Sequence, residues 1–163
     1  MKTVKMIIIL ILISFFVFSC FETENEYDFD GNDFAYDISV WFMWDDFQPE
    51  GKDTISLYVK TDEEIGNSNL RILSQIEIDG NEIKIEFTGI YSPPIVHCDE
   101  APASANIKLA LNGKDDLYKI VFFSGDSIST ASLRYYKLLG KYVLKPIEQT
   151  NVTINECILY VEE

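Results

Sequence analysis

The stretch Gln75-Ile-Glu-Ile-Asp-Gly-Asn-Glu-Ile-Lys-Ile-Glu-Phe87 decides the fold class of this chain. Apolar and polar side chains alternate on both sides of Gly80-Asn81, which is the pattern of two half-buried strands. Glycine and asparagine tolerate the positive φ of a tight turn. With both at the tip, Glu77 lies opposite Lys84, whereas a tip one residue earlier sets Glu77 against Glu82, an unfavourable like-charge pair. The stretch predicts a hairpin that pairs Ile78 with Ile83 and Ile76 with Ile85.

The two-residue period recurs along most of the chain after residue 35. It predicts strands at 36–44, 54–60, 107–111, 117–123, 142–144 and 152–161. The segment Ser127–Leu139 is mixed: its β-branched and aromatic residues favour a strand, and Ala131, Leu133 and Leu138 favour a helix. We expect a strand. Many short strands separated by turn residues predict an all-β fold, specifically an antiparallel β-sandwich of immunoglobulin-like topology.

The first 20 residues have the pattern of a targeting segment. Lys2 and Lys5 lead into 13 residues, 6–18, that are apolar except for Ser14. A membrane span takes about 20 residues, so this run fits the core of a signal peptide better. It ends in Val17-Phe18-Ser19-Cys20, with an aliphatic residue three positions before the cysteine and a small one directly before it. This segment resembles the type II signal peptides of bacterial lipoproteins, and the resemblance implies cleavage before Cys20 with a lipid on its sulfur.

The alternatives at this position are an ordinary cleaved signal peptide and a buried free cysteine. The lipoprotein interpretation divides the chain into a signal peptide (1–19), an acidic flexible tether (20–34) and one domain (35–163). It places the protein in the bacterial cell envelope, anchored to a membrane that we expect to be the outer one, on its periplasmic or exposed side. The acidic residues after Cys20 and the stretch 89–123 also resemble uncharacterised surface lipoproteins of the Bacteroidota type. In that stretch, Cys98 and Pro102-Ala103 precede a strand, a turn at Gly113 and another strand.

The chain is strongly acidic, with a formal net charge of −14. Without Lys2 and Lys5 it keeps 11 basic and 27 acidic side chains, and 11 − 27 gives −16. Nucleic-acid binding needs a basic footprint, so this balance argues against it. It also leads us to expect that the lipid on Cys20 alone holds the protein at the membrane. No cofactor is expected.

Two cysteines remain once Cys20 is lipidated. Cys98 and Cys157 lie in a chain that we expect to be exported, where disulfides persist. A bond between them closes a loop of roughly 60 residues, and the chain-entropy model gives such a loop about 4 kcal/mol of stabilisation. The alternative is two buried thiols too far apart to bond. His97 adjoins Cys98, and neighbours on an extended strand point to opposite faces, which argues against a catalytic cysteine.

Two further groups are candidate binding sites. Trp41, Met43 and Phe47 lie opposite the predicted apolar stripe, where they form a binding surface for sugars or protein if the second face of their strand is exposed. Asp28, Asp30 and Asp33 surround a glycine as calcium ligands do, but their spacing departs from that of the EF-hand. The alternative for these acids is a solvated linker.

No motif of an enzyme stands out, since no serine lies in a Gly-x-Ser-x-Gly turn and the chain has 1 histidine. We expect a lipid-anchored, non-catalytic binding or structural accessory module, with a protein or glycan as partner. The alternatives are a carbohydrate-binding lipoprotein that uses the exposed aromatics, and a small hydrolase built on paired carboxylates.

Overall fold

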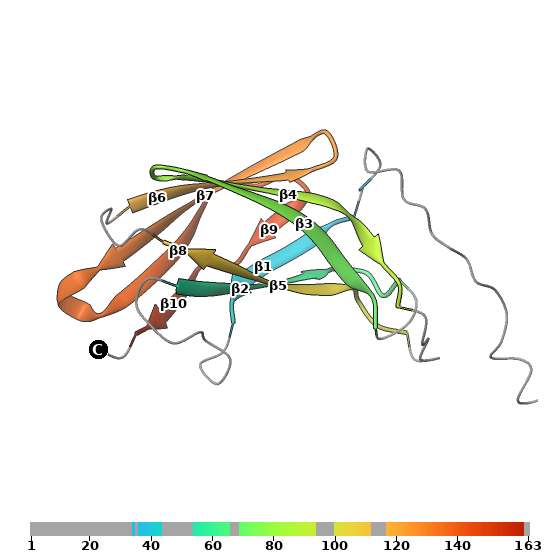
Figure 1. The fold of residues 1–163 in the computed structure, drawn as a ribbon, viewed down its shortest axis with the longest axis horizontal. Coiled ribbons are helices and arrows are strands. Elements are labelled where there is room, and N and C mark those ends of the chain that lie inside the picture. The colour runs from blue at the N-terminus through green and yellow to red at the C-terminus, as the bar shows by residue number, and fades with distance from the viewer. Residues whose placement is uncertain are drawn as a thin grey trace, which may run out of the picture.

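The computed structural model of the chain describes residue 34 and residues 36–43, 54–65, 69–93, 100–111 and 117–161. These residues form one ten-stranded sheet, which confirms the all-β class (Figure 1). Its strands are β1 (Ile38–Phe42), β2 (Thr54–Thr61), β3 (Arg71–Asp79), β4 (Glu82–Tyr91), β5 (Ser104–Ala110), β6 (Leu117–Ser124), β7 (Ser127–Tyr136), β8 (Lys141–Glu148), β9 (Val152–Ile154) and β10 (Cys157–Tyr160). The 3₁₀ helix η2 (Lys137–Leu139) joins β7 to β8.

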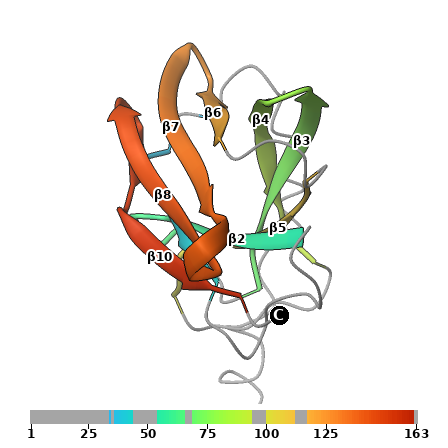
Figure 2. The ribbon, with the colours of Figure 1, turned by 90° about the vertical axis from the view of Figure 1, so that its left-hand side faces the viewer.

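The sheet curls until its two edges meet. Its strand order is β10-β8-β7-β6-β4-β3-β5-β2-β1-β9, so β9 and β10 lie at opposite edges. In the sequence, however, only Asn155 and Glu156 separate these two strands. The sequence predicts one strand over residues 152–161, and the structure divides it, because the chain leaves β1 and joins β8. The end-on view in Figure 2 shows β7, β8 and β10 on one side, β3 and β4 on the other, and β2 with β5 below.

The strands pair in both directions. Three pairs are parallel, namely β1 with β9, β3 with β5 and β4 with β6, and the others are antiparallel. The sheet is therefore mixed, where the sequence predicts a wholly antiparallel arrangement. Two of the parallel pairs follow from the connection after β4, which carries the chain past β3 to β5 and back to β4 as β6, and the third forms where β9 lies beside β1 at the edge of the sheet. The immunoglobulin-like topology stays a prediction.

The β3–β4 hairpin has the predicted register. Ile78 pairs with Ile83, Ile76 with Ile85 and Glu77 with Lys84. Gly80 at the tip has a φ of 59°, the left-handed conformation that glycine adopts without strain. The Nζ atom of Lys84 lies 3.3 Å from the Oε2 atom of Glu77. The opposite charges that favour this register in the sequence thus meet in the structure.

The two sides of this hairpin differ in burial. Ile83 and Ile85 on β4 are 0 % exposed, whereas Ile76 and Ile78 on β3 are 42 % and 41 % exposed. β4 lies between β3 and β6, but β3 pairs with β5 only through Arg71 and Ser104. Among the described residues, the outer half of β3 therefore has β4 on one side and no strand on the other, and its isoleucines lie outside the core.

Alternate residues of the other strands fill the inside of the curled sheet. The predicted stripes of β1 and β2 are buried, and these are Ile38, Val40, Phe42, Ile55, Leu57 and Val59. Phe34 is also buried, although the sequence places it in the tether. Its ring centroid lies 5.6 Å from that of Tyr36 and 5.9 Å from that of Phe87. The folded part of the chain thus includes Phe34.

The mixed segment Ser127–Leu139 is a strand up to Tyr136, as expected. Ala131 and Leu133 are buried on its inner face, and η2 takes up its last three residues. Among the described residues, no helix has the length and apolar character that crossing a membrane requires.

Candidate functional site

A basic–aromatic face covers the outer side of β6, β7, β8 and β10. We define it as three rows of side chains that the strand register places next to each other. The first row is Tyr136, Lys141 and Tyr160; the second is Leu117, Arg134, Val143 and Ile158; the third is Lys119, Ser132 and Lys145. All of these residues except Val143, which is 7 % exposed, are at least partly open to solvent, and they alternate with buried ones such as Leu133 and Leu144, so the face belongs to the solvent side of the sheet.

The charge of this face differs from that of the chain. Residues 127–147 contain Arg134, Lys137, Lys141 and Lys145 but no aspartate or glutamate. The chain as a whole carries 27 acidic and 13 basic side chains. Two acids border the face: Glu156 forms an ion pair of 3.0 Å with Lys145, and Glu82 one of 3.4 Å with Lys119. The region around Tyr136 is thus a positive island on an acidic protein.

Basic side chains lie over the tyrosine rings at one end of the face. The Nζ atom of Lys141 lies 5.8 Å from the ring centroid of Tyr136 and 5.9 Å from that of Tyr160. The Cζ atom of Arg134 lies 5.9 Å from the ring centroid of Tyr136. Such cation–π contacts hold a charge close to an apolar ring. The first two rows therefore offer positive charge and aromatic surface in one place.

A shallow hollow of about 350 Å³ lies on this face. Its lining residues are Leu117, Ser132, Arg134, Tyr136, Val143 and Lys145. The guanidinium of Arg134, the ammonium of Lys145 and the hydroxyl of Ser132 supply hydrogen-bond donors, and the remaining side chains are largely apolar. This combination suits a ligand that carries a carboxylate, sulfate or phosphate beside an apolar or sugar-like part.

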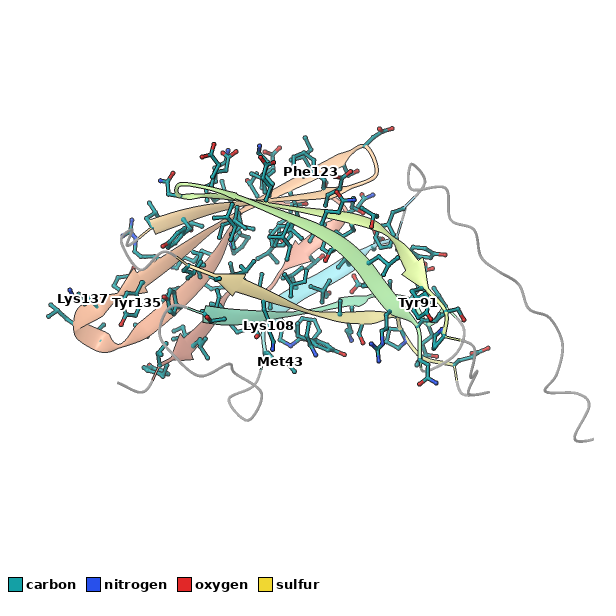
Figure 3. The ribbon with its side chains drawn as sticks, viewed as in Figure 1. Met43, Tyr91, Lys108, Phe123, Tyr135 and Lys137 are labelled. Carbon is teal, nitrogen blue, oxygen red and sulfur yellow. The ribbon has the colours of Figure 1, made fainter. Side chains whose placement is uncertain are left out.

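An apolar tip projects beyond the face where η2 turns the chain from β7 into β8. Leu138 is fully exposed (101 %), and Leu139 is 60 % exposed. Gly140 closes the turn with a φ of 53°, and its carbonyl accepts a hydrogen bond of 2.8 Å from the Val161 N–H. Figure 3 shows Lys137 at the far left end of the molecule, on this turn. The tip is thus held at its base while its two leucines face solvent.

The residues predicted as a ligand-binding surface are only partly described. Trp41 and Met43 are half-buried on the outer side of β1, and Phe47 lies outside the described residues. The ring centroids of Trp41 and Tyr58 are 5.0 Å apart at an interplanar angle of 58°, and Lys60 Nζ lies 5.7 Å from the Trp41 ring. Trp41 is therefore packed against its neighbours and does not stand free. Met43 and Lys108 lie low in Figure 3, well away from Lys137.

Cys157 is the predicted disulfide partner that the structure describes. Its thiol is free, half-buried at the start of β10, and accepts a hydrogen bond of 3.3 Å from the Phe42 N–H. Burial raises the pKa of the thiol, the Phe42 N–H lowers it, and the nearby Glu156 raises it, with a net rise. Cys98 and the lipidation residue Cys20 lie outside the described residues, so the disulfide and the anchor stay predictions.

The calcium candidates Asp28, Asp30 and Asp33 also lie outside the described residues. Within the part that the structure describes, no three His, Cys, Asp or Glu side chains come together as a metal site would require.

The basic–aromatic face was not predicted from the sequence, although its signal is present in the chain. An acid-free stretch of 21 residues, 127–147, is unusual in a protein with 27 acids, and the net charge hides it. What the sequence does not show is that β6 and β10 flank β7 and β8 and add Leu117, Ile158 and Tyr160. Comparison of the chain with protein families, with curated proteins and with solved structures finds no match.

Proposed function

We propose that the protein is a lipid-anchored, non-catalytic binding module of the bacterial cell envelope, and that the basic–aromatic face holds its partner. The anchor rests on the resemblance of residues 1–20 to a lipoprotein signal peptide. The binding role rests on one observation, the gathering of exposed tyrosines, aliphatic side chains and basic groups on β6, β7, β8 and β10. Exposed apolar side chains among polar ones are typical of interaction surfaces.

The charge of the face indicates the kind of partner. Arg134 and Lys145 line the hollow, on a protein whose formal net charge is −14. An anionic partner is repelled by most of the protein surface and attracted by this face, so the charge distribution directs such a partner to the face. Tyrosine and arginine also contribute most of the binding energy in many interfaces. We therefore expect an anionic partner.

The test measures binding of the purified full chain to dextran sulfate and to neutral dextran. The double variant Arg134→Ala with Lys145→Ala is expected to lose most of the binding to dextran sulfate. A matched control, Lys60→Ala with Lys108→Ala, removes the same charge from β2 and β5 and is expected to retain binding. Equal loss in both double variants overturns the assignment, because it means that the net charge matters and the face does not.

A second candidate partner is a neutral glycan on the outer side of β1 and β2. The observation that favours it is the pairing of Trp41 with Tyr58, since aromatic rings stack on sugars. Their tilt of 58° leaves no flat platform, which makes this candidate the weaker one. Binding on a glycan array that Trp41→Ala abolishes and the Arg134 variant leaves intact supports it. Binding that survives Trp41→Ala removes it.

A further inference from the structure

We propose that the partner of the basic–aromatic face is the bilayer itself, and that the β7–β8 hairpin inserts its tip, Leu138 and Leu139, among anionic lipids. The inference deepens the proposed function and rests on its placement of the protein at a membrane. It also adds a second membrane contact to the lipid on Cys20. The net charge of the chain led us to expect the anchor alone, but local charge is what a lipid surface meets.

The first argument is the exposure of the tip. Leu138 has no shielding from the rest of the described protein, and Leu139 has little. Leucine gains more than most residues from transfer into a hydrocarbon environment. Two adjacent leucines at the end of a projecting hairpin reach a bilayer before any other part of the face does. A flat protein partner is a poorer fit for such a tip, because a projecting loop needs a recess to receive it.

The second argument is the order of side chains along the hairpin. Leucines form the tip, the row of Tyr136, Lys141 and Tyr160 comes next, and Arg134 lies two residues further along β7. Two residues of a strand span about 6.6 Å. A bilayer has the same order over similar distances: hydrocarbon, then an interface that favours tyrosine, then phosphates that attract arginine and lysine. Lys141 joins the two levels, because its ammonium lies over the rings of Tyr136 and Tyr160 and remains available to a lipid phosphate.

The sequence of the β7–β8 hairpin itself contains no acidic residue before Glu148. The segment 127–147 holds four basic residues and no acidic one. By contrast, the β3–β4 hairpin carries Glu77, Asp79, Glu82 and Glu86 around its own exposed isoleucines. Both hairpins expose aliphatic residues, but only the β7–β8 hairpin combines them with positive charge. The comparison within one molecule selects this hairpin for an anionic lipid surface.

The fourth argument is the reach of the chain that leads to the anchor. Phe34 lies at the far end of β7, because its carbonyl accepts a hydrogen bond of 3.4 Å from Ser124 Oγ. From there to the tip, the 10 residues of β7 span about 33 Å at 3.3 Å per residue, and the 3 residues of η2 add about 6 Å at 2.0 Å per residue. The 14 residues from Cys20 to Phe34 span at most about 46–50 Å. The anchor therefore reaches the level of the tip when this segment is extended. If the hairpin inclines so that its basic–aromatic face turns toward the lipids, residues 20–34 need less extension.

The experiment places a photo-crosslinker at the tip of the full chain in bacterial cells. Benzoylphenylalanine replaces Leu138, and in a matched control it replaces Asn81 at the exposed tip of the β3–β4 hairpin. After irradiation, mass spectrometry identifies what is bound. We expect a phospholipid adduct at position 138 and none at position 81. Lys137→Glu with Lys141→Glu is expected to lower the adduct yield at 138 by roughly tenfold or more, since each basic residue adds to the attraction of an anionic surface.

Three results overturn the inference. They are a protein or glycan adduct at position 138, no adduct there, and a lipid adduct of equal yield at position 81. Labelling the same cells with a radioactive fatty acid distinguishes a hairpin that does not dock on the membrane from a chain that carries no lipid anchor. A chain that is labelled but gives no lipid adduct at 138 is anchored without docking. A chain without label removes the anchor, whatever the adduct shows.

Discussion

The backbone N–H of Phe42 donates a hydrogen bond of 3.3 Å to the Sγ atom of Cys157, across 115 positions of the sequence. Phe42 ends β1 and Cys157 begins β10, which lie near opposite edges in the order of the sheet. The contact helps to close the curled sheet, because it joins β1 near one edge to β10 at the other. The Cys157 thiol therefore occupies a structural position.

The first prediction concerns the reactivity of this thiol. In reduced, folded protein, iodoacetamide is expected to alkylate Cys157 more slowly at pH 8 than in urea-unfolded protein, because the thiolate is the reactive form and burial raises the pKa. The protonated thiol's contribution to the free energy of unfolding is complete below the pKa of the unfolded chain, about 8.5, and is lost as the pH rises through the higher folded pKa. Cys157→Ser serves as the control that lacks this loss. Equal alkylation rates in both states contradict the prediction.

The second prediction uses two glycines with similar backbones. Gly80 and Gly125 have φ values of +59° and +55°. An added Cβ meets nothing within 4 Å at Gly80, but lies 3.1 Å from the Phe34 carbonyl oxygen at Gly125. Gly80→Ala is expected to cost about 1–2 kcal/mol through backbone strain alone. Gly125→Ala is expected to cost more, because the backbone of Phe34 must also move. Urea unfolding of both variants measures the difference, and equal costs remove the Phe34 contact as a cause.

The sequence pattern correctly predicted those parts of the fold that depend on neighbouring residues, namely the register of a hairpin and the buried side of a strand. The register of the β3–β4 hairpin follows from Gly80-Asn81 and from the opposite charges of Glu77 and Lys84. The buried stripe of β1 follows from strict alternation. Neither inference needs any knowledge of distant strands, and both are confirmed.

Strand order and partial exposure could not be predicted in this way. Nothing in the alternation of β4 and β6 indicates that they pair in parallel. Ile76 and Ile78 have the same pattern as Ile83 and Ile85, and they are exposed only because β3 and β5 diverge after Arg71. The basic–aromatic face likewise needs the long-range pairing of β10 with β8, which places Tyr160 beside Lys141.

The third prediction tests the anchor. Radioactive fatty acid is expected to label the wild-type chain and not Cys20→Ala, because the resemblance to lipoprotein signal peptides makes the Cys20 sulfur the acceptor. Cys157→Ala removes a different cysteine and is expected to keep the label. Label retained in Cys20→Ala, or absent from the wild type, contradicts the lipoprotein assignment. The same exported material, analysed by mass spectrometry without reduction, shows whether Cys98 and Cys157 are bonded.

The fourth prediction separates folding from docking on one hairpin. Leu133 on β7 is 0 % exposed, and Leu138, five residues further on, is 101 % exposed. Leu133→Ala leaves a cavity in the core and is expected to cost about 2–5 kcal/mol of unfolding free energy. Leu138→Ala removes no contact within the described protein, so its unfolding free energy is expected to stay within about 0.5 kcal/mol of wild type. Urea denaturation in detergent compares the two. A large loss with Leu138→Ala means that the leucine packs within the protein, in which case it is not available to a membrane. A stable Leu138→Ala variant means that the fold does not depend on this leucine. Its side chain is then available for contact with lipid.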